Sequence, residues 1–129
     1  MNAQIAFNTH TIVDSSYSVL GCKDVVLADI DGDGDNDVLA SSASQNKTVW
    51  YKNLDGLGNF SDQILINGSA TSAAKLEVLD IDGDGDFDLV VLLKLQNQIV
   101  WYENTDSQGT FGEANVISVP TNYPESILS

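Results

Sequence analysis

Short apolar runs rich in β-branched side chains recur along this chain, and Gly- and Asp-rich turns separate them. In the first half they predict strands over about residues 24–30, 37–43, 48–53 and 60–66. A turn rich in Asp and Gly lies between the last two runs. The runs are too short for typical helices, so the pattern predicts an all-β fold.

The same order of features returns after 51 residues, the distance from Asp29 to Asp80. The stretch Val-Trp-Tyr-Lys-Asn at 49–53 aligns with Val-Trp-Tyr-Glu-Asn at 100–104. A Gly-x-Phe follows each stretch, at 58–60 and at 109–111. Four antiparallel strands in a repeat of about 50 residues are typical of a β-propeller blade. We therefore expect two complete four-stranded blades.

Each repeat carries a nine-residue acidic loop, Asp-Ile-Asp-Gly-Asp-Gly-Asp-Asn-Asp at 29–37 and Asp-Ile-Asp-Gly-Asp-Gly-Asp-Phe-Asp at 80–88. So many neighbouring carboxylates repel one another strongly unless a cation lies among them. Gly34, at position six, is expected to adopt a positive φ where the chain wraps an ion. At position seven we expect the backbone carbonyl of Asp35 to be the ligand. The candidate metal residues are Asp29, Asp31, Asp33, Asp35, Asp37, Asp80, Asp82, Asp84, Asp86 and Asp88.

The donors in both loops are hard oxygens without Cys or His, a set that favours Ca²⁺ over zinc. Mg²⁺ fits less well because it keeps its waters and rarely uses an all-protein cage. An EF-hand would need a Glu at position twelve, where this chain has Ala40 and Val91. The β-branched flanks instead favour a hairpin. We expect two Ca²⁺ sites, one per repeat; the alternative is a solvated acidic turn without an ion.

The acidic loops, the Trp-Tyr-x-Asn stretches and the Gly-x-Phe motifs together resemble FG-GAP/VCBS-type repeats, which are related to the blades of integrin α-subunit heads. The resemblance covers about residues 5–119. It implies that each loop joins the first two strands of a blade and holds Ca²⁺ near the blade's edge. The expected units are the last strand of a preceding blade at 1–13, blade 1 at 14–66, blade 2 at 67–119, and the lead-in to a following blade at 120–129.

Two blades cannot close a propeller ring, which needs about four to eight. Two alternatives stay open: the chain is a fragment of a longer parent, or copies self-associate. A trimer would give six blades and a tetramer eight.

The net charge of −14, with only five Lys and Arg together, argues against a nucleic-acid or anionic-membrane partner. No apolar run approaches the roughly 20 residues of a membrane span, and the first residues do not resemble a signal peptide. Because extracellular Ca²⁺ modules bind at about 10⁻⁴–10⁻³ M, we expect a secreted or cell-surface location. Cys22 is the only cysteine, and a buried position is expected for it.

The sequence favours a Ca²⁺-stabilised structural, assembly or ligand-binding module, and enzyme activity is not expected because the aspartates serve as metal ligands. The alternatives are a lectin-like carbohydrate-binding propeller or a non-catalytic part of a polysaccharide-active enzyme. In similar families, including some fungal lectins and the integrin heads of cell adhesion, propeller tops and the clefts between blades bind glycans or protein ligands. Trp50, Tyr51, Trp101 and Tyr102 offer flat faces to sugars, although strand alternation predicts that one of each pair packs between blades. Residues that bind such a ligand are not identified by the sequence.

Overall fold

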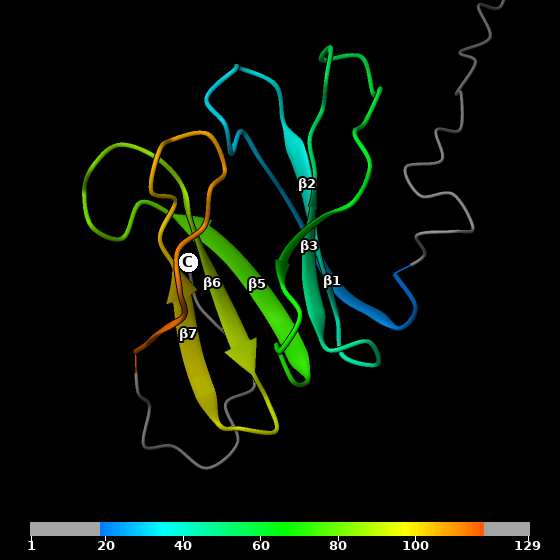
Figure 1. The fold of residues 1–129 in the computed structure, drawn as a ribbon, viewed down its shortest axis with the longest axis vertical. Coiled ribbons are helices and arrows are strands. Elements are labelled where there is room, and N and C mark those ends of the chain that lie inside the picture. Colours follow the sequence, from blue (N-terminus) through cyan, green and yellow to red (C-terminus); the bar gives the residue numbers. More distant parts are fainter. Residues whose placement is uncertain (1–18, 118–129) are drawn as a thin grey trace, which may run out of the picture.

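The computed structural model describes residues 19–117, which form two four-stranded antiparallel sheets (Figure 1). Sheet 1 contains β1 (Cys22–Ala28), β2 (Asp37–Ser42), β3 (Lys47–Tyr51) and β4 (Ile64–Asn67). Sheet 2 contains β5 (Ala73–Leu79), β6 (Asp88–Leu93), β7 (Gln98–Tyr102) and β8 (Asn115–Val116). In each sheet every strand pairs with the next one along the chain. The all-β prediction is confirmed, and the two sheets have the strand order of propeller blades.

The strand bounds differ from the prediction at both sides of sheet 1. The first strand ends at Ala28, because the N–H of Ile30 donates to a carboxylate oxygen of Asp37 rather than to a neighbouring strand. The fourth strand begins at Ile64, and Phe60 makes only an isolated bridge with Asn53. In the segment between Phe60 and Ile64, the Ser61 hydroxyl accepts the N–H of Lys52. A local side-chain acceptor therefore replaces part of the expected strand pairing.

The two faces of each sheet follow from strand alternation. In sheet 1 one face, here the Tyr face, carries Val38, Ala40, Val49 and Tyr51, which form one buried cluster. The opposite face, the Trp face, carries Val26, Leu39 and Trp50. The repeat gives sheet 2 the same two faces, with Leu76, Leu89, Val91, Val100 and Tyr102 on its Tyr face and Val90, Leu92 and Trp101 on its Trp face.

The Trp face of sheet 1 packs against the Tyr face of sheet 2. One core cluster joins Leu39 and Trp50 to Leu89 and Tyr102. At the edge of this interface the N–H of Leu76 donates to a carboxylate oxygen of Asp24 over 2.9 Å. The contact uses different faces of two similar sheets, so it is a head-to-tail contact.

Cys22 is exposed at the start of β1, so its predicted burial is wrong. The strand lies at one side of sheet 1, where β2 is its only partner in the sheet. The predicted terminal units at 1–13 and 120–129 lie outside the described residues, and the predicted bounds of the two blades stay a prediction. Within residues 19–117, no helix is long and apolar enough to cross a membrane.

Candidate metal centre

The first acidic loop, residues 29–37, connects β1 to β2, and the second acidic loop, residues 80–88, connects β5 to β6. Both loops need a residue that tolerates a left-handed backbone. Gly34 has φ +95° and Gly85 has φ +99°. The predicted positive φ at position six is confirmed, and glycine is favoured there because it has no Cβ.

In each loop, carboxylate oxygens accept backbone N–H groups of the same loop. In the first loop the N–H of Gly34 donates to Asp29 Oδ2 and the N–H of Asp35 donates to Asp33 Oδ1, both over 3.0 Å. In the second loop the N–H of Gly85 donates to Asp80 Oδ2 over 3.1 Å, at the matching position. Asp29 thereby uses one oxygen for the backbone, and its other oxygen has no hydrogen-bond partner.

Two aspartate triads result. The first consists of Asp29, Asp31 and Asp33, and the second of Asp80, Asp82 and Asp88. In each triad one oxygen from every residue lies within 4.8 Å of the others. Of the ten candidate residues, Asp35, Asp37, Asp84 and Asp86 lie outside these triads.

The first loop also contains buried oxygens that no donor satisfies. Asp29 Oδ1 and Asp31 Oδ1 are buried and have no hydrogen-bond partner. Leaving a buried carboxylate oxygen unpaired is costly. A hard cation that accepts oxygen ligands in flexible geometry would satisfy both atoms, so the residues present fit Ca²⁺.

The position-nine aspartates have a structural role that the sequence did not reveal. Asp37 is buried; its Oδ2 accepts the N–H of Ile30 over 3.1 Å and its Oδ1 accepts the N–H of Asn53 over 2.8 Å. Asp88 binds the N–H groups of Ile81 and Asn104 in the same way. Burial raises the pKa of Asp37, although these two backbone N–H groups oppose the shift. The position-nine carboxylate therefore fastens the acidic loop to the end of the third strand.

The position-seven side chains contact the connection between the third and fourth strands of their own sheet. The Asp35 carboxylate lies against Gly56 in the β3–β4 connection. Asp86 Oδ2 accepts the Ser107 hydroxyl in the β7–β8 connection over 2.8 Å. The Asp35 side chain thus lies outside the first triad, and ligation by its backbone carbonyl stays a prediction.

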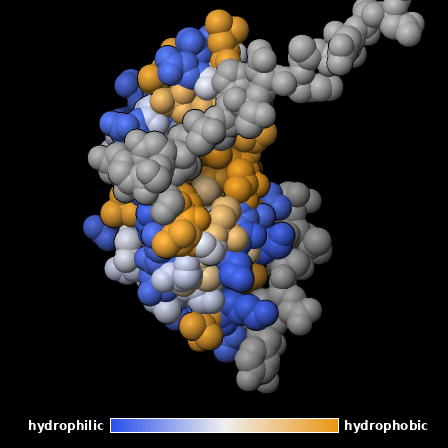
Figure 2. All heavy atoms as spheres, turned by 90° about the vertical axis from the view of Figure 1, so that its right-hand side faces the viewer, coloured by the Kyte–Doolittle hydropathy of each residue, from blue (hydrophilic) through white to orange (hydrophobic). Residues whose placement is uncertain are grey.

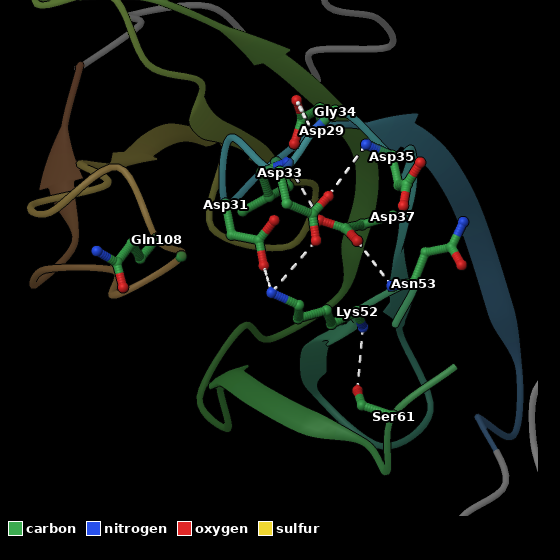
Figure 3. A network of polar contacts seen from close by, with 12 residues as sticks. Asp29, Asp31, Asp33, Gly34, Asp35, Asp37, Lys52, Asn53, Ser61 and Gln108 are labelled. Atoms are coloured by element: carbon green, nitrogen blue, oxygen red, sulfur yellow. Dashed lines mark hydrogen bonds and ion pairs between the residues drawn. The ribbon is translucent and has the colours of Figure 1, made fainter. Parts of the chain in front are cut away.

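Lys52 is a cation that the loop pattern alone did not predict. Its ammonium pairs with Asp31 Oδ2 and lies 3.4 Å from Asp33 Oδ2 (Figure 3). The N–H of Asp35 and then Lys52 hold the pKa of Asp33 below its usual value. In the second loop the pKa of Asp82 is raised instead, first by desolvation and then by neighbouring carboxylates.

The asparagine of the second Trp-Tyr-x-Asn stretch links the two loops. Asn104 is fully buried, and its side-chain N–H₂ donates to the Ile30 carbonyl over 2.9 Å and to the Phe87 carbonyl over 3.4 Å. Its Oδ1 accepts the N–H of Gly109 over 2.9 Å. One amide thus joins the first acidic loop, the second acidic loop and the β7–β8 connection.

The two loops also line one shallow pocket of about 240 Å³. Asp29 and Gly32 contribute from the first loop, and Asp84 and Asp86 from the second. The acidic loops therefore lie beside each other where the two sheets meet.

Comparison with protein families agrees with this geometry. The model of the FG-GAP-like repeat matches residues 29–91, from the first residue of the first loop into β6. Neither the curated proteins nor the solved structures gave a match. The matched segment contains both acidic loops and both aspartate triads. Residues 29–91 of this chain are thus an FG-GAP-like repeat segment, carried by two blade-like sheets with a pair of aspartate triads that are compatible with Ca²⁺.

Proposed function

We propose that this chain is a Ca²⁺-stabilised, non-catalytic propeller module in which each acidic loop binds one Ca²⁺. The observation that carries the proposal is the pair of aspartate triads, together with the unsatisfied buried oxygens of Asp29 and Asp31. Asp29, Asp31 and Asp33 would hold the first ion, and Asp80, Asp82 and Asp88 the second, with backbone carbonyls completing the shell.

The structural role follows from what the first loop contacts. Ile30, at position two of this loop, is 1% exposed and packs in the core between the sheets. Its carbonyl accepts the amide of Asn104. A cation that offsets carboxylate repulsion would hold the loop in the conformation that places Ile30 there. Ca²⁺ therefore stabilises the contact between blades as well as the loop itself.

A Ca²⁺ titration by isothermal calorimetry tests the assignment of the two sites. We expect two ions per chain. Asp31→Ala and Asp82→Ala should each remove one site and spare the other, because each deletes a carboxylate from one triad. Asp35→Ala should bind two ions, since its side chain lies against Gly56 and its carbonyl remains.

Asp62→Ala is the matched control, because it removes one exposed carboxylate outside both loops. Its titration should equal that of the unmodified protein. Absence of any Ca²⁺ binding at millimolar concentrations would reject the proposed function. Loss of the first site in Asp35→Ala would reject the role given to position seven.

We further propose that other blades cover the outer faces of this pair. Matched positions in the two sheets support this. Leu76 on the Tyr face of sheet 2 is 2% exposed, whereas its counterpart Val25 on sheet 1 is 51% exposed. Ile30 is 1% exposed, whereas its counterpart Ile81 in the second loop is 36% exposed. Val25 on sheet 1 and Ile81 in the second loop are thus exposed at positions whose counterparts are buried between the sheets.

The occupant that fits best is another blade of the same kind, because the Trp face of one sheet fits the Tyr face of the next. Seen from the side of sheet 1, apolar side chains appear at the surface among polar ones (Figure 2). A head-to-tail contact that repeats can close into a ring. Copies of this chain, as a trimer or tetramer, or further blades of a longer parent would supply the missing neighbours.

Sedimentation velocity in Ca²⁺ buffer tests self-association. We expect an oligomer that Leu27→Asp dissociates, since Leu27 is exposed on the Tyr face of sheet 1. Leu95→Asp, in the exposed β6–β7 turn, should leave the oligomer intact. A monomer at all concentrations would contradict self-association and favour neighbours from a longer parent.

The module suits a secreted or cell-surface protein, where millimolar Ca²⁺ would keep both sites filled. A protein or glycan ligand at the blade surface is compatible with this role. A lectin-like function, or a place in a polysaccharide-active enzyme, is supported less, because Trp50, Tyr51 and Tyr102 are buried. Of the four aromatic residues, only Trp101 is partly exposed, as sugar stacking would require. A glycan array in Ca²⁺ buffer that yields no ligand would remove the lectin-like alternative.

A further inference from the structure

The two acidic loops differ at one matched position. Lys52, the residue between Tyr51 and Asn53, aligns with Glu103 in the second repeat. Both residues directly follow the strand whose end is fastened to position nine of the loop. The backbone that carries the two side chains is therefore equivalent, and the difference lies in charge.

In the first loop the Lys52 ammonium lies among the carboxylates that would hold an ion. It contacts Asp31 and Asp33, two of the three members of the first triad (Figure 3). The Asp31 side chain is only 3% exposed, and its second oxygen has no partner. The ammonium thus satisfies one oxygen of a buried carboxylate and leaves the other without a hydrogen-bond partner.

In the second loop no lysine has this role among the described residues. The salt bridges formed by Lys52 and Lys75 involve Asp31, Asp33 and Asp24, none of which belongs to the second loop. Five aspartates and Lys52 give the first loop a formal charge of −4, whereas five aspartates and Glu103 give the second a formal charge of −6. Coulomb attraction for a dication is correspondingly stronger at the second loop.

We propose that Lys52 is a built-in competing cation, so that Ca²⁺ fills the second loop first and enters the first loop only when it displaces the ammonium. This inference rests on the proposed Ca²⁺ function and adds an order of filling. Without Ca²⁺, Lys52 offsets carboxylate repulsion in the first loop. With Ca²⁺, the side chain must leave Asp31 and Asp33, and this displacement weakens the first site.

Calorimetric Ca²⁺ titration of single-site proteins tests the proposal. Asp82→Ala leaves the first site alone, and Asp31→Ala leaves the second. We expect the first site to bind at least about tenfold more weakly than the second. Lys52→Met, added to Asp82→Ala, should tighten the first site by about tenfold or more, since methionine has a similar length without the charge.

Lys47→Met in the Asp82→Ala background is the matched control. It removes one positive charge from the other end of β3, where the ammonium donates to Gln63. Its effect on Ca²⁺ affinity should stay below about twofold because salt screens distant charges. A gain equal to that of Lys52→Met would overturn the proposal in favour of a general charge effect.

The reciprocal exchange provides a second variant. Glu103→Lys in the Asp31→Ala background should weaken the second site by about tenfold or more, because it supplies the missing ammonium. In EGTA, Lys52→Met should lower the melting temperature, opposite in direction to its gain in Ca²⁺ affinity. If Lys52 had only a structural role, Lys52→Met would lower the melting temperature in EGTA without raising the Ca²⁺ affinity.

The outcomes separate this inference from the proposed function. If neither single-site protein binds Ca²⁺ while the folded chain is intact, the proposed function fails. If both sites bind with equal affinity and Lys52→Met changes nothing, Ca²⁺ binding stands and the competing-cation proposal is overturned.

Discussion

At the scale of single residues, aspartates in the first acidic loop have three different roles. Asp31 keeps a buried, unpartnered oxygen within the first triad. Asp35 directs its carboxylate toward Gly56. Asp37 accepts two backbone N–H groups. Within the first loop, the role of an aspartate therefore depends on its position.

Asp37→Asn tests the structural use. An asparagine offers one acceptor and one N–H₂, so one of the buried N–H groups of Ile30 or Asn53 would lose its acceptor. We expect a loss of about 1–3 kcal/mol in the free energy of unfolding, measured by urea denaturation in EGTA. Measurement without Ca²⁺ separates this effect from metal binding.

Asp33→Asn is the comparison variant, because Asp33 is exposed and its Oδ1 accepts one N–H within its own loop. In EGTA it should change the free energy of unfolding by less than about 0.5 kcal/mol. Equal losses in the two variants would show that position nine has no special structural role.

At the scale of elements, Asn104 joins three connections that are distant in sequence. Its amide contacts the Ile30 and Phe87 carbonyls, and its oxygen accepts the Gly109 N–H. Asn53 is its counterpart in sheet 1 and donates to the Asn36 carbonyl within the same sheet over 3.2 Å. Of these two asparagines, Asn104 is the one that spans both described sheets through its side chain.

Asn104→Ala should therefore cost more than Asn53→Ala. The first substitution leaves the buried carbonyl of Ile30 without its donor and removes a link between the sheets. We expect a difference of about 1–2 kcal/mol in the free energy of unfolding, by urea denaturation in saturating Ca²⁺. Identical losses would mean that the contact between the sheets contributes little.

The strands also show which parts of the fold could be predicted from the sequence. The β-branched runs and the period of 51 residues predicted both sheets, because strand propensity and repetition depend only on the local sequence and its spacing. They did not predict the late start of β4, which depends on the Ser61 hydroxyl and the Lys52 N–H. Lys52 and Asn104 act through contacts 21 and 74 residues away in sequence, which no loop motif reveals.

The candidate site was partly predictable for the same reason. The loop pattern predicted all six aspartates of the two triads and the positive φ at Gly34. It did not distinguish the fastening role of Asp37 from ligation, because both use a carboxylate at the same position. That distinction requires knowing where the N–H of Asn53 lies.

At the scale of the whole molecule, the head-to-tail contact explains why two similar sheets are not equivalent. The Trp face of sheet 1 is covered by sheet 2, whereas its Tyr face keeps the exposed side chains of Val25 and Leu27. Among residues 19–117, the acidic loops lie beside the interface between the sheets and contribute Ile30 to it. The proposed metal binding would therefore be coupled to the packing of the two sheets.

The central claim is that Ca²⁺ in the acidic loops stabilises this pair of blades. The most direct test is the melting temperature by circular dichroism, in millimolar Ca²⁺ and then in EGTA. A free Ca²⁺ concentration 100-fold above Kd stabilises by about 2.7 kcal/mol per site. Since about 1 kcal/mol moves the melting temperature of a domain this size by several degrees, we predict a fall of about 10 °C or more in EGTA, reversed by added Ca²⁺. An unchanged melting curve would contradict structural Ca²⁺ sites and leave the loops as solvated acidic turns.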